Sequence, residues 1–172
     1  STGRLAEVQK IVRIATAYAA DAGAVRSITD NTGPSPHVTP SPAAIGAMNH
    51  IALPTADPER GAKFYCDVLG FVSTPRPAFS FRGAWLLHRA VGVMIHLIHD
   101  ANFQPNLTAP INSRTNHLAI HVDDYDAAVA QLAAHGVEFV QHVLPTYGYR
   151  QVFFRDPDGN VIELGEWPAP AE

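Results

Sequence analysis

The strongest constraint on the fold of this chain is an internal repeat. The segment Asn49–Leu53 (NHIAL) resembles Asn116–Ile120 (NHLAI), at an offset of 67 residues. The tripeptides centred on His96 and Glu163, Ile-His-Leu and Ile-Glu-Leu, have the same offset. Self-similarity at a fixed spacing indicates duplicated supersecondary units that bury their apolar faces together. We therefore expect two copies of one unit.

Each copy is predicted to run as a strand, a helix and three further strands. In the first copy Asp57–Glu59 offers an N-cap acid, a proline for the first helical position and an acid in the first turn, and Gly70 ends the helix. In the second copy Asp124 and Gly136 bound a helix in the same way. The predicted strands are residues 49–53, 71–73, 85–88 and 91–98, followed by 116–122, 137–142, 151–155 and 160–165. This order predicts an α+β fold of paired βαβββ units.

The N-terminal region has a different character from the repeat. Residues 1–30 are expected to form a helical arm, because apolar residues recur there at spacings of three and four. Residues 31–46 contain several prolines, which favour an extended linker. The globular domain is expected at residues 47–166, with its two copies at 47–100 and 115–166.

Composition excludes several classes of partner and location. The net charge of the 172 residues is −4, and no basic stripe suggests binding to nucleic acid or to a membrane surface. The single cysteine, Cys66, excludes an intrachain disulfide and a cysteine-rich zinc site. No apolar run reaches the length needed to span a bilayer, and the first helix lacks the apolar core of a secretory signal. We expect a cytoplasmic protein whose partner is a small-molecule substrate.

Four polar residues at repeat-related positions form a candidate metal site. His50 is equivalent to His117, and His96 is equivalent to Glu163, each on an otherwise apolar strand. Duplicated units commonly pack about a pseudo-twofold axis, which would bring such residues together. A buried carboxylate needs a partner, and three histidines with one carboxylate supply the nitrogen and oxygen ligands typical of Zn, Fe, Ni, Co or Mn. The alternative for any single one of these histidines is an ordinary core or surface residue.

The motifs of this chain resemble those of the vicinal oxygen chelate superfamily, which includes glyoxalase I, bleomycin-resistance proteins and extradiol dioxygenases. The resemblance covers residues 47–166. It is carried by the segments Asn49–Leu53 (NHIAL), Phe64–Phe71 (FYCDVLGF), His117–Ile120 (HLAI) and Phe154–Leu164 (FRDPDGNVIEL). It implies a cup-shaped mixed sheet made of two βαβββ units, with a divalent metal on its concave face, and a homodimer.

Carried over by position, the resemblance implies a glyoxalase-like lyase or isomerase. His50, His117 and Glu163 match the most widespread metal ligands, and His96 matches a further ligand that is often glutamate or glutamine. The metal would stabilise an enediolate formed from a small substrate with oxygens on neighbouring carbons, and Glu163 would act as the catalytic base. His96 sets this chain apart from glyoxalase I, which has a carboxylate on each side of its substrate.

Three other activities are compatible with this site. Two histidines and one carboxylate also form the iron site of extradiol-type Fe(II) dioxygenases, which His50, His117 and Glu163 would fit. Thiol transfer to fosfomycin ranks below ring cleavage, because no potassium or phosphonate site can be identified. A metal-free small-molecule binding or resistance protein is the non-enzymatic alternative. Four intact candidate ligands favour an enzyme.

Four more residues are candidates for substrate binding. His121 lies two positions after His117 and shares its strand face, where it could act as a base near the ligands, although a surface position is the favoured interpretation. Arg150 could bind a substrate carboxylate or take part in structural ion pairs. Trp85 and Phe153 could line the pocket or belong to the core.

Overall fold

The computed structural model describes residue 44 and residues 46–167. Residues 49–74 and 80–167 belong to one compact unit, and residues 75–79 lie outside it. The arm predicted for residues 1–30 falls outside the described residues, as does nearly all of the linker predicted for residues 31–46. No helix in the described part of the chain combines the length and apolarity that crossing a bilayer requires.

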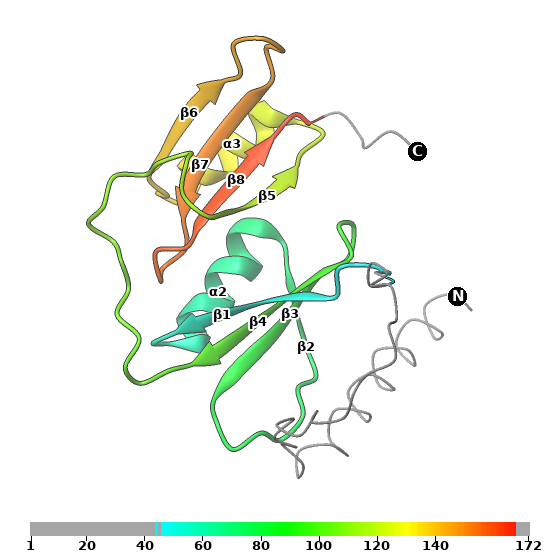
Figure 1. Ribbon diagram of the computed structural model, residues 1–172, viewed down its shortest axis with the longest axis vertical. Helices are drawn as coiled ribbons and strands as arrows, with labels where there is room; N and C mark the ends of the chain where they lie inside the picture. Colours follow the sequence, from blue (N-terminus) through cyan, green and yellow to red (C-terminus); the bar gives the residue numbers. More distant parts are fainter. Residues whose placement is uncertain (1–43, 45, 168–172) are drawn as a thin grey trace, which may run out of the picture. The chain divides into compact units, whose positions relative to one another are not determined.

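The first half folds as a βαβββ unit (Figure 1). Its strands form a four-stranded sheet in the order β1-β4-β3-β2, in which β1 and β4 run parallel and the other pairs run antiparallel. Its elements are β1 (His50–Thr55), α2 (Pro58–Leu69), β2 (Val72–Thr74), β3 (Gly83–His88) and β4 (Val93–His99).

The second half repeats this plan in a separate sheet with the order β5-β8-β7-β6, again with one parallel pair, β5 and β8. Its elements are β5 (His117–His121), α3 (Tyr125–Ala134), β6 (Phe139–Val143), β7 (Arg150–Arg155) and β8 (Val161–Gly165). The predicted α+β fold of paired βαβββ units is confirmed, and its eight strands form two four-stranded sheets.

The register of the sheets confirms the repeat residue by residue. Ala52 pairs with His96 across β1 and β4, and Ala119 pairs with Glu163 across β5 and β8. Ala119 lies 67 residues after Ala52, and Glu163 lies 67 residues after His96, as the sequence repeat requires. The two halves therefore place equivalent residues at equivalent sites of their own sheets.

Both helices begin and end where the sequence predicts. The side chain of Asp57 accepts a hydrogen bond from the backbone N–H of Arg60 at 3.1 Å, and Asp124 accepts one from Ala127 at 2.9 Å. These bonds satisfy donors that have no partner inside a helix. Gly70 ends α2 with φ of 71°, a left-handed conformation that glycine adopts without steric cost.

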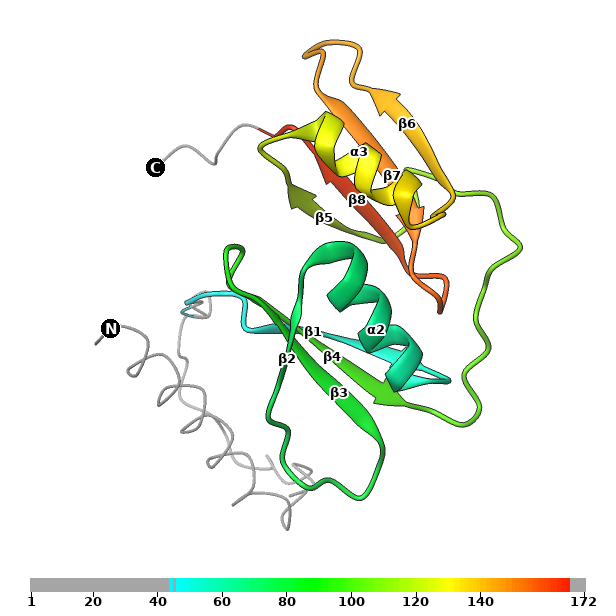
Figure 2. The ribbon, with the colours of Figure 1, turned by 180° about the vertical axis from the view of Figure 1, so that it is seen from behind.

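One face of each sheet packs against a helix. The helix α2 contacts β2, β3 and β4, and α3 contacts β8 (Figure 2). The buried side chains on these faces form one core that draws on both halves. Polar contacts also join the halves. The hydroxyl of Tyr65 donates to Asp156 Oδ2 at 2.9 Å in the interior, and Arg60, whose side chain is partly exposed, pairs with Asp158 at 3.0 Å.

Candidate metal centre

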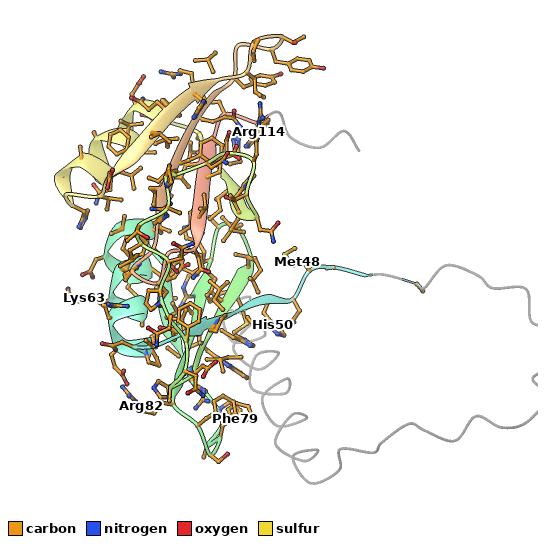
Figure 3. All side chains as sticks on the ribbon, turned by 60° about the vertical axis from the view of Figure 1, so that its left-hand side comes forward. Met48, His50, Lys63, Phe79, Arg82 and Arg114 are labelled. Carbon is orange, nitrogen blue, oxygen red and sulfur yellow. The ribbon has the colours of Figure 1, made fainter. Side chains whose placement is uncertain are left out.

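Strand alternation directs the candidate ligands away from the helices. On β4, Ile95 and Leu97 are buried in the core, so His96 between them points to the opposite face. On β8, Ile162 and Leu164 belong to the core, and Glu163 points away from it in the same manner. Figure 3 shows His50 on the side of β1 opposite to α2, the helix that carries Lys63.

The second half brings two of the predicted ligands into direct contact. Nε2 of His117 lies 3.0 Å from Oε2 of Glu163. Glu163 is 2 % exposed, whereas the side chain of His117 is 27 % exposed. The other ring nitrogen of His117, Nδ1, lies 2.7 Å from the carbonyl oxygen of Thr115. The pair therefore combines a buried carboxylate with an imidazole that reaches the surface.

The hydrogen bond to Thr115 fixes which ring nitrogen of His117 carries a proton. A carbonyl oxygen only accepts, so Nδ1 of His117 must carry a proton and donate it. A neutral imidazole then has its lone pair on Nε2, facing a carboxylate oxygen. Two lone pairs at 3.0 Å repel each other unless a proton or a cation lies between them. This is the donor arrangement of a metal-binding histidine, whose second nitrogen usually donates to a carbonyl or carboxylate.

The first half pairs the other two predicted ligands in a different way. The rings of His50 and His96 are stacked, with centroids 4.0 Å apart and planes inclined by 16°. Nδ1 of His50 lies 2.8 Å from Oδ1 of Asn49, which leaves Nε2 as the nitrogen able to bind a cation. Trp85 stacks on the other face of His96 at 4.3 Å, so that three rings form one stack.

The four candidate ligands do not meet within one chain. No group of three or more His, Cys, Asp or Glu side chains among the described residues is placed to hold a metal ion. From the sequence, the four ligands are expected to converge on one cation, and it stays open whether they come from one chain or from two. Within this chain each half brings its own two candidates together, because the parallel strand pairs β1–β4 and β5–β8 set the neighbours.

The two aromatic candidates contact the candidate ligands. Phe153 is paired with Glu163 across β7 and β8, and its ring meets that of His117 edge-on at 5.6 Å. Trp85 holds the equivalent place in the first half, paired with His96 across β3 and β4. Both side chains are buried, and each packs beside its candidate ligand.

The other two candidates, Arg150 and His121, have protein partners. Arg150 forms ion pairs with Glu166 at 2.6 Å and Asp126 at 2.8 Å, and it lies over the ring of Tyr125. The bonds to Glu166 first, and then those to Asp126, raise the pKa of Arg150. This geometry favours the structural alternative for Arg150. His121 is half-exposed and contacts Asp123 at 3.1 Å, as a surface residue would.

One contact of the candidate site was not anticipated from the sequence. The amide of Gln151 donates from Nε2 to Oε1 of Glu163 at 2.7 Å, and both side chains are buried. Strand parity offered a signal, because Gln151 lies two residues before Phe153 and therefore shares its sheet face. The contact itself depends on the register of β7 against β8.

Comparison with known proteins shows which family and which proteins this chain resembles. The family model described as the Glyoxalase/Bleomycin resistance protein/Dioxygenase superfamily matches residues 47–164. An Arabidopsis thaliana protein named Glyoxylase I 4 is 29% identical over 127 residues, which is 72% of each chain. An Escherichia coli (strain K12) protein named YaeR, described as uncharacterized, is 36% identical over 122 residues, or 69% of this chain and 95% of YaeR.

A solved structure with the same fold is that of TnmS3 from Streptomyces sp. CB03234, described as an antibiotic binding protein. It is 28% identical, with a TM-score of 0.55, and the match covers 71% of this chain and 96% of TnmS3.

Proposed function

Because the chain belongs to the Glyoxalase/Bleomycin resistance protein/Dioxygenase superfamily, we propose that it is a metal-dependent lyase or isomerase of the glyoxalase I-like type. Its substrate would be a small molecule with oxygen atoms on neighbouring carbons. The observation that carries the proposal is the contact between Nε2 of His117 and Oε2 of Glu163 at 3.0 Å. That contact requires a proton or a cation between the two atoms, because Nδ1 of His117 donates to the Thr115 carbonyl.

The cation would be held by His117 and Glu163 together with His50 and His96. Since one chain keeps these residues in two separate pairs, the proposal includes a homodimer in which a second copy completes the set. The faces of both sheets that carry the pairs are the faces turned away from α2 and α3.

Glu163 is the residue that moves the proton in this proposal. A bound divalent cation acts as a Lewis acid and lowers the energy of negative charge on a substrate oxygen. Oε2 of Glu163 would leave the cation and take a proton from the hydroxyl-bearing carbon next to a carbonyl group, and the electron pair of the broken C–H bond would move toward the carbonyl oxygen. The same carboxyl group would then return this proton to the former carbonyl carbon. The proton of the adjacent hydroxyl group would move to the new oxyanion, so the net reaction is an isomerisation that needs no oxidant. Glu163 is the one carboxylate among the four candidates, which favours a single acid–base group.

The first test is metal binding combined with proton exchange. The full chain is loaded with Zn²⁺, Ni²⁺, Co²⁺, Mn²⁺ or Fe²⁺, dialysed and analysed for bound metal. It is then incubated with small α-hydroxyketones in ²H₂O while the exchange of carbon-bound protons is followed by NMR. Glu163→Gln keeps the side-chain shape and removes the base, so exchange should fall by about 10²–10⁴-fold.

The matched control is His135→Gln, which changes an exposed histidine at the end of α3. Its exchange rate should equal that of the wild-type protein. A wild-type chain that retains no metal, or a Glu163→Gln variant that exchanges as fast as wild type, would contradict the proposal.

A second candidate function is supported by the ring stack of the first half. Trp85, His96 and His50 stack face to face, an arrangement that a planar aromatic ligand could extend without a metal. The similarity to TnmS3 supports such a binding protein. Binding of planar aromatic compounds that persists in a metal chelator and is lost in His50→Ala would favour this function over the enzyme.

A further inference from the structure

The buried amide of Gln151 holds one oxygen of the proposed base. Its Nε2 donates to Oε1 of Glu163 at 2.7 Å, while Oε2 of the same carboxylate faces His117 at 3.0 Å. Glu163 is 2 % exposed and Gln151 is 7 % exposed, so water competes little for either oxygen. A hydrogen bond to a charged acceptor in such surroundings is strong and directional. The two oxygens of Glu163 are therefore not equivalent.

The two halves differ at this position in a correlated way. Gln151 pairs with Gly165 across β7 and β8, and the equivalent pair across β3 and β4 is Gly83 with Ile98. The first half thus has a glycine where the second half has Gln151. It also has His96 where the second half has Glu163, so an amide side chain stands at this position beside the carboxylate and a glycine stands there beside the histidine.

The backbone under Gln151 is also held in place. The hydroxyl of Tyr125 donates to the carbonyl oxygen of Gln151 at 3.1 Å, from the helix side of the sheet. Tyr125 is buried, so this bond fixes the strand at the residue from which the amide extends. The amide therefore starts from a fixed backbone position.

We propose that Gln151 is a positioning residue that restricts Glu163 to binding a divalent cation through Oε2 alone. The inference rests on the proposed function, because it assigns a role within the proposed metal centre. A carboxylate can bind a cation through one oxygen or through both. With Oε1 engaged by Gln151, a single oxygen reaches the cation, which leaves more coordination positions for two neighbouring substrate oxygens. Partners of this kind orient metal ligands and tune the affinity of a site.

The experiment uses Co²⁺ as the probe and the full chain as the protein. Gln151→Met keeps the length of the side chain and removes the donor, and Gln151→Asn keeps an amide that is one methylene too short to reach. Both variants should bind Co²⁺ about 10–100-fold more weakly than wild type, measured by titration. The visible absorption of bound Co²⁺ should also change in intensity, because a second carboxylate oxygen raises the coordination number.

The matched control is Gln141→Met, which removes the same amide from β6. The side chain of Gln141 donates to the hydroxyl of Tyr125 on the helix side of the sheet and makes no contact with Glu163 in the described hydrogen bonds. Its Co²⁺ affinity and spectrum should match those of the wild-type protein. Circular dichroism of all three variants establishes that they fold.

The outcomes separate this inference from the proposed function. If wild type binds Co²⁺ and both Gln151 variants bind it equally well with the wild-type spectrum, the positioning role is wrong and the metal centre stands. If wild type binds no Co²⁺ or any other divalent metal, both proposals fail. If Gln141→Met loses affinity to the same degree, loosening of the sheet explains the effect and the role of Gln151 is refuted.

Discussion

The turn that joins β3 to β4 and the turn that joins β7 to β8 occupy equivalent positions in the two halves. The first, Arg89–Gly92, is exposed to solvent, whereas the second, Asp156–Gly159, buries two carboxylates. Asp156 accepts hydrogen bonds from Tyr65 and Asn160. Equivalent turns of a duplicated fold can therefore differ in burial: one is exposed to solvent, and the other packs between the two halves.

The candidate ligands also differ between the two halves. The first half contributes stacked rings, His50 on His96 on Trp85, and the second half contributes the carboxylate of Glu163 with its partners His117 and Gln151. Stacked rings supply a flat aromatic surface, whereas the carboxyl group of Glu163 supplies a buried oxygen ligand. Duplication has therefore given two matching scaffolds that carry different chemistry.

The largest expected effect comes from removing one ligand from each half. His50→Ala and His117→Ala should each weaken binding of Zn²⁺ by more than about a hundredfold, because loss of a direct ligand exceeds the effect of a supporting residue. The measurement is competition with a chromophoric chelator. Mixing the two variants should restore tight binding to a fraction of the sites, since each chain retains the half that the other lacks.

The control for this mixing is each variant alone at the same total concentration. Loss of affinity in His117→Ala with full affinity in His50→Ala would mean that the second half binds metal by itself, and that the first half has no share in the site.

The next largest effect distinguishes the two turns. Gly92 and Gly159 are equivalent and have φ of 70° and 90°, so a side chain is strained at either position. A Cβ atom on Gly92 would meet nothing within 4 Å, whereas one on Gly159 would lie 2.5 Å from the carbonyl oxygen of Asn106. Gly92→Ala should lower the free energy of unfolding by about 1–2 kcal/mol. Gly159→Ala should lower it by about 1–3 kcal/mol more, because backbone atoms must move.

Urea denaturation of both variants measures this difference. Equal losses of stability would mean that the junction around Gly159 is not packed against Asn106.

A smaller effect is expected from the hydroxyl of Tyr65. Tyr65 in the first half and Leu132 in the second half are equivalent in the repeat, and both are buried. Of the two, only Tyr65 has a hydroxyl group, which donates a hydrogen bond to Asp156 of the other half at 2.9 Å. Burial, followed by the charges of Asp156 and Asp158, raises the pKa of Tyr65 well above its ordinary value, so the hydroxyl remains a donor. Tyr65→Phe should lower the free energy of unfolding by about 1–3 kcal/mol.

Thermal and urea denaturation test this loss, with Tyr147→Phe as the control because Tyr147 is 70 % exposed. If Tyr65→Phe were as stable as Tyr147→Phe, the hydroxyl of Tyr65 would not stabilise the contact between the halves.

The smallest effect is a difference in pH dependence between two aspartates. Burial, the largest cause, raises the pKa of Asp156 above its ordinary value of 3.8, although hydrogen bonds from Asn160 and Tyr65 oppose it. The folded state therefore binds this proton more tightly than the unfolded state. The contribution of Asp156 to stability is greatest below pH 3.8 and falls as the pH rises through the raised pKa.

Asp57 should behave in the opposite way, because the backbone N–H of Arg60 lowers its pKa. Titration of the carboxyl carbon shifts by NMR should place Asp156 above 3.8 and Asp57 below it. The opposite order would contradict the distinction between the buried Asp156 and the half-buried helix cap Asp57.

Much of this fold follows from local patterns in the sequence. Asp57 and Asp124 mark the helix starts because a short acidic side chain satisfies free backbone donors. His96 and Glu163 each stand between apolar residues in the sequence, and in the structure both face away from the core that those neighbours join. The turn at Asp156–Gly159 is predicted by its proline and glycine, whereas its burial against α2 depends on residues far away in the chain.

Local patterns in the sequence predict the duplication and the order of the elements, because periodicity and capping act over a few residues. Tertiary structure decided which of the candidate ligands become neighbours, since pairing of β1 with β4 and of β5 with β8 joins strands that are distant in the chain. It also placed Gln151 on Glu163, because parity within β7 gives the sheet face of Gln151 but only the register of β7 against β8 brings the two side chains together.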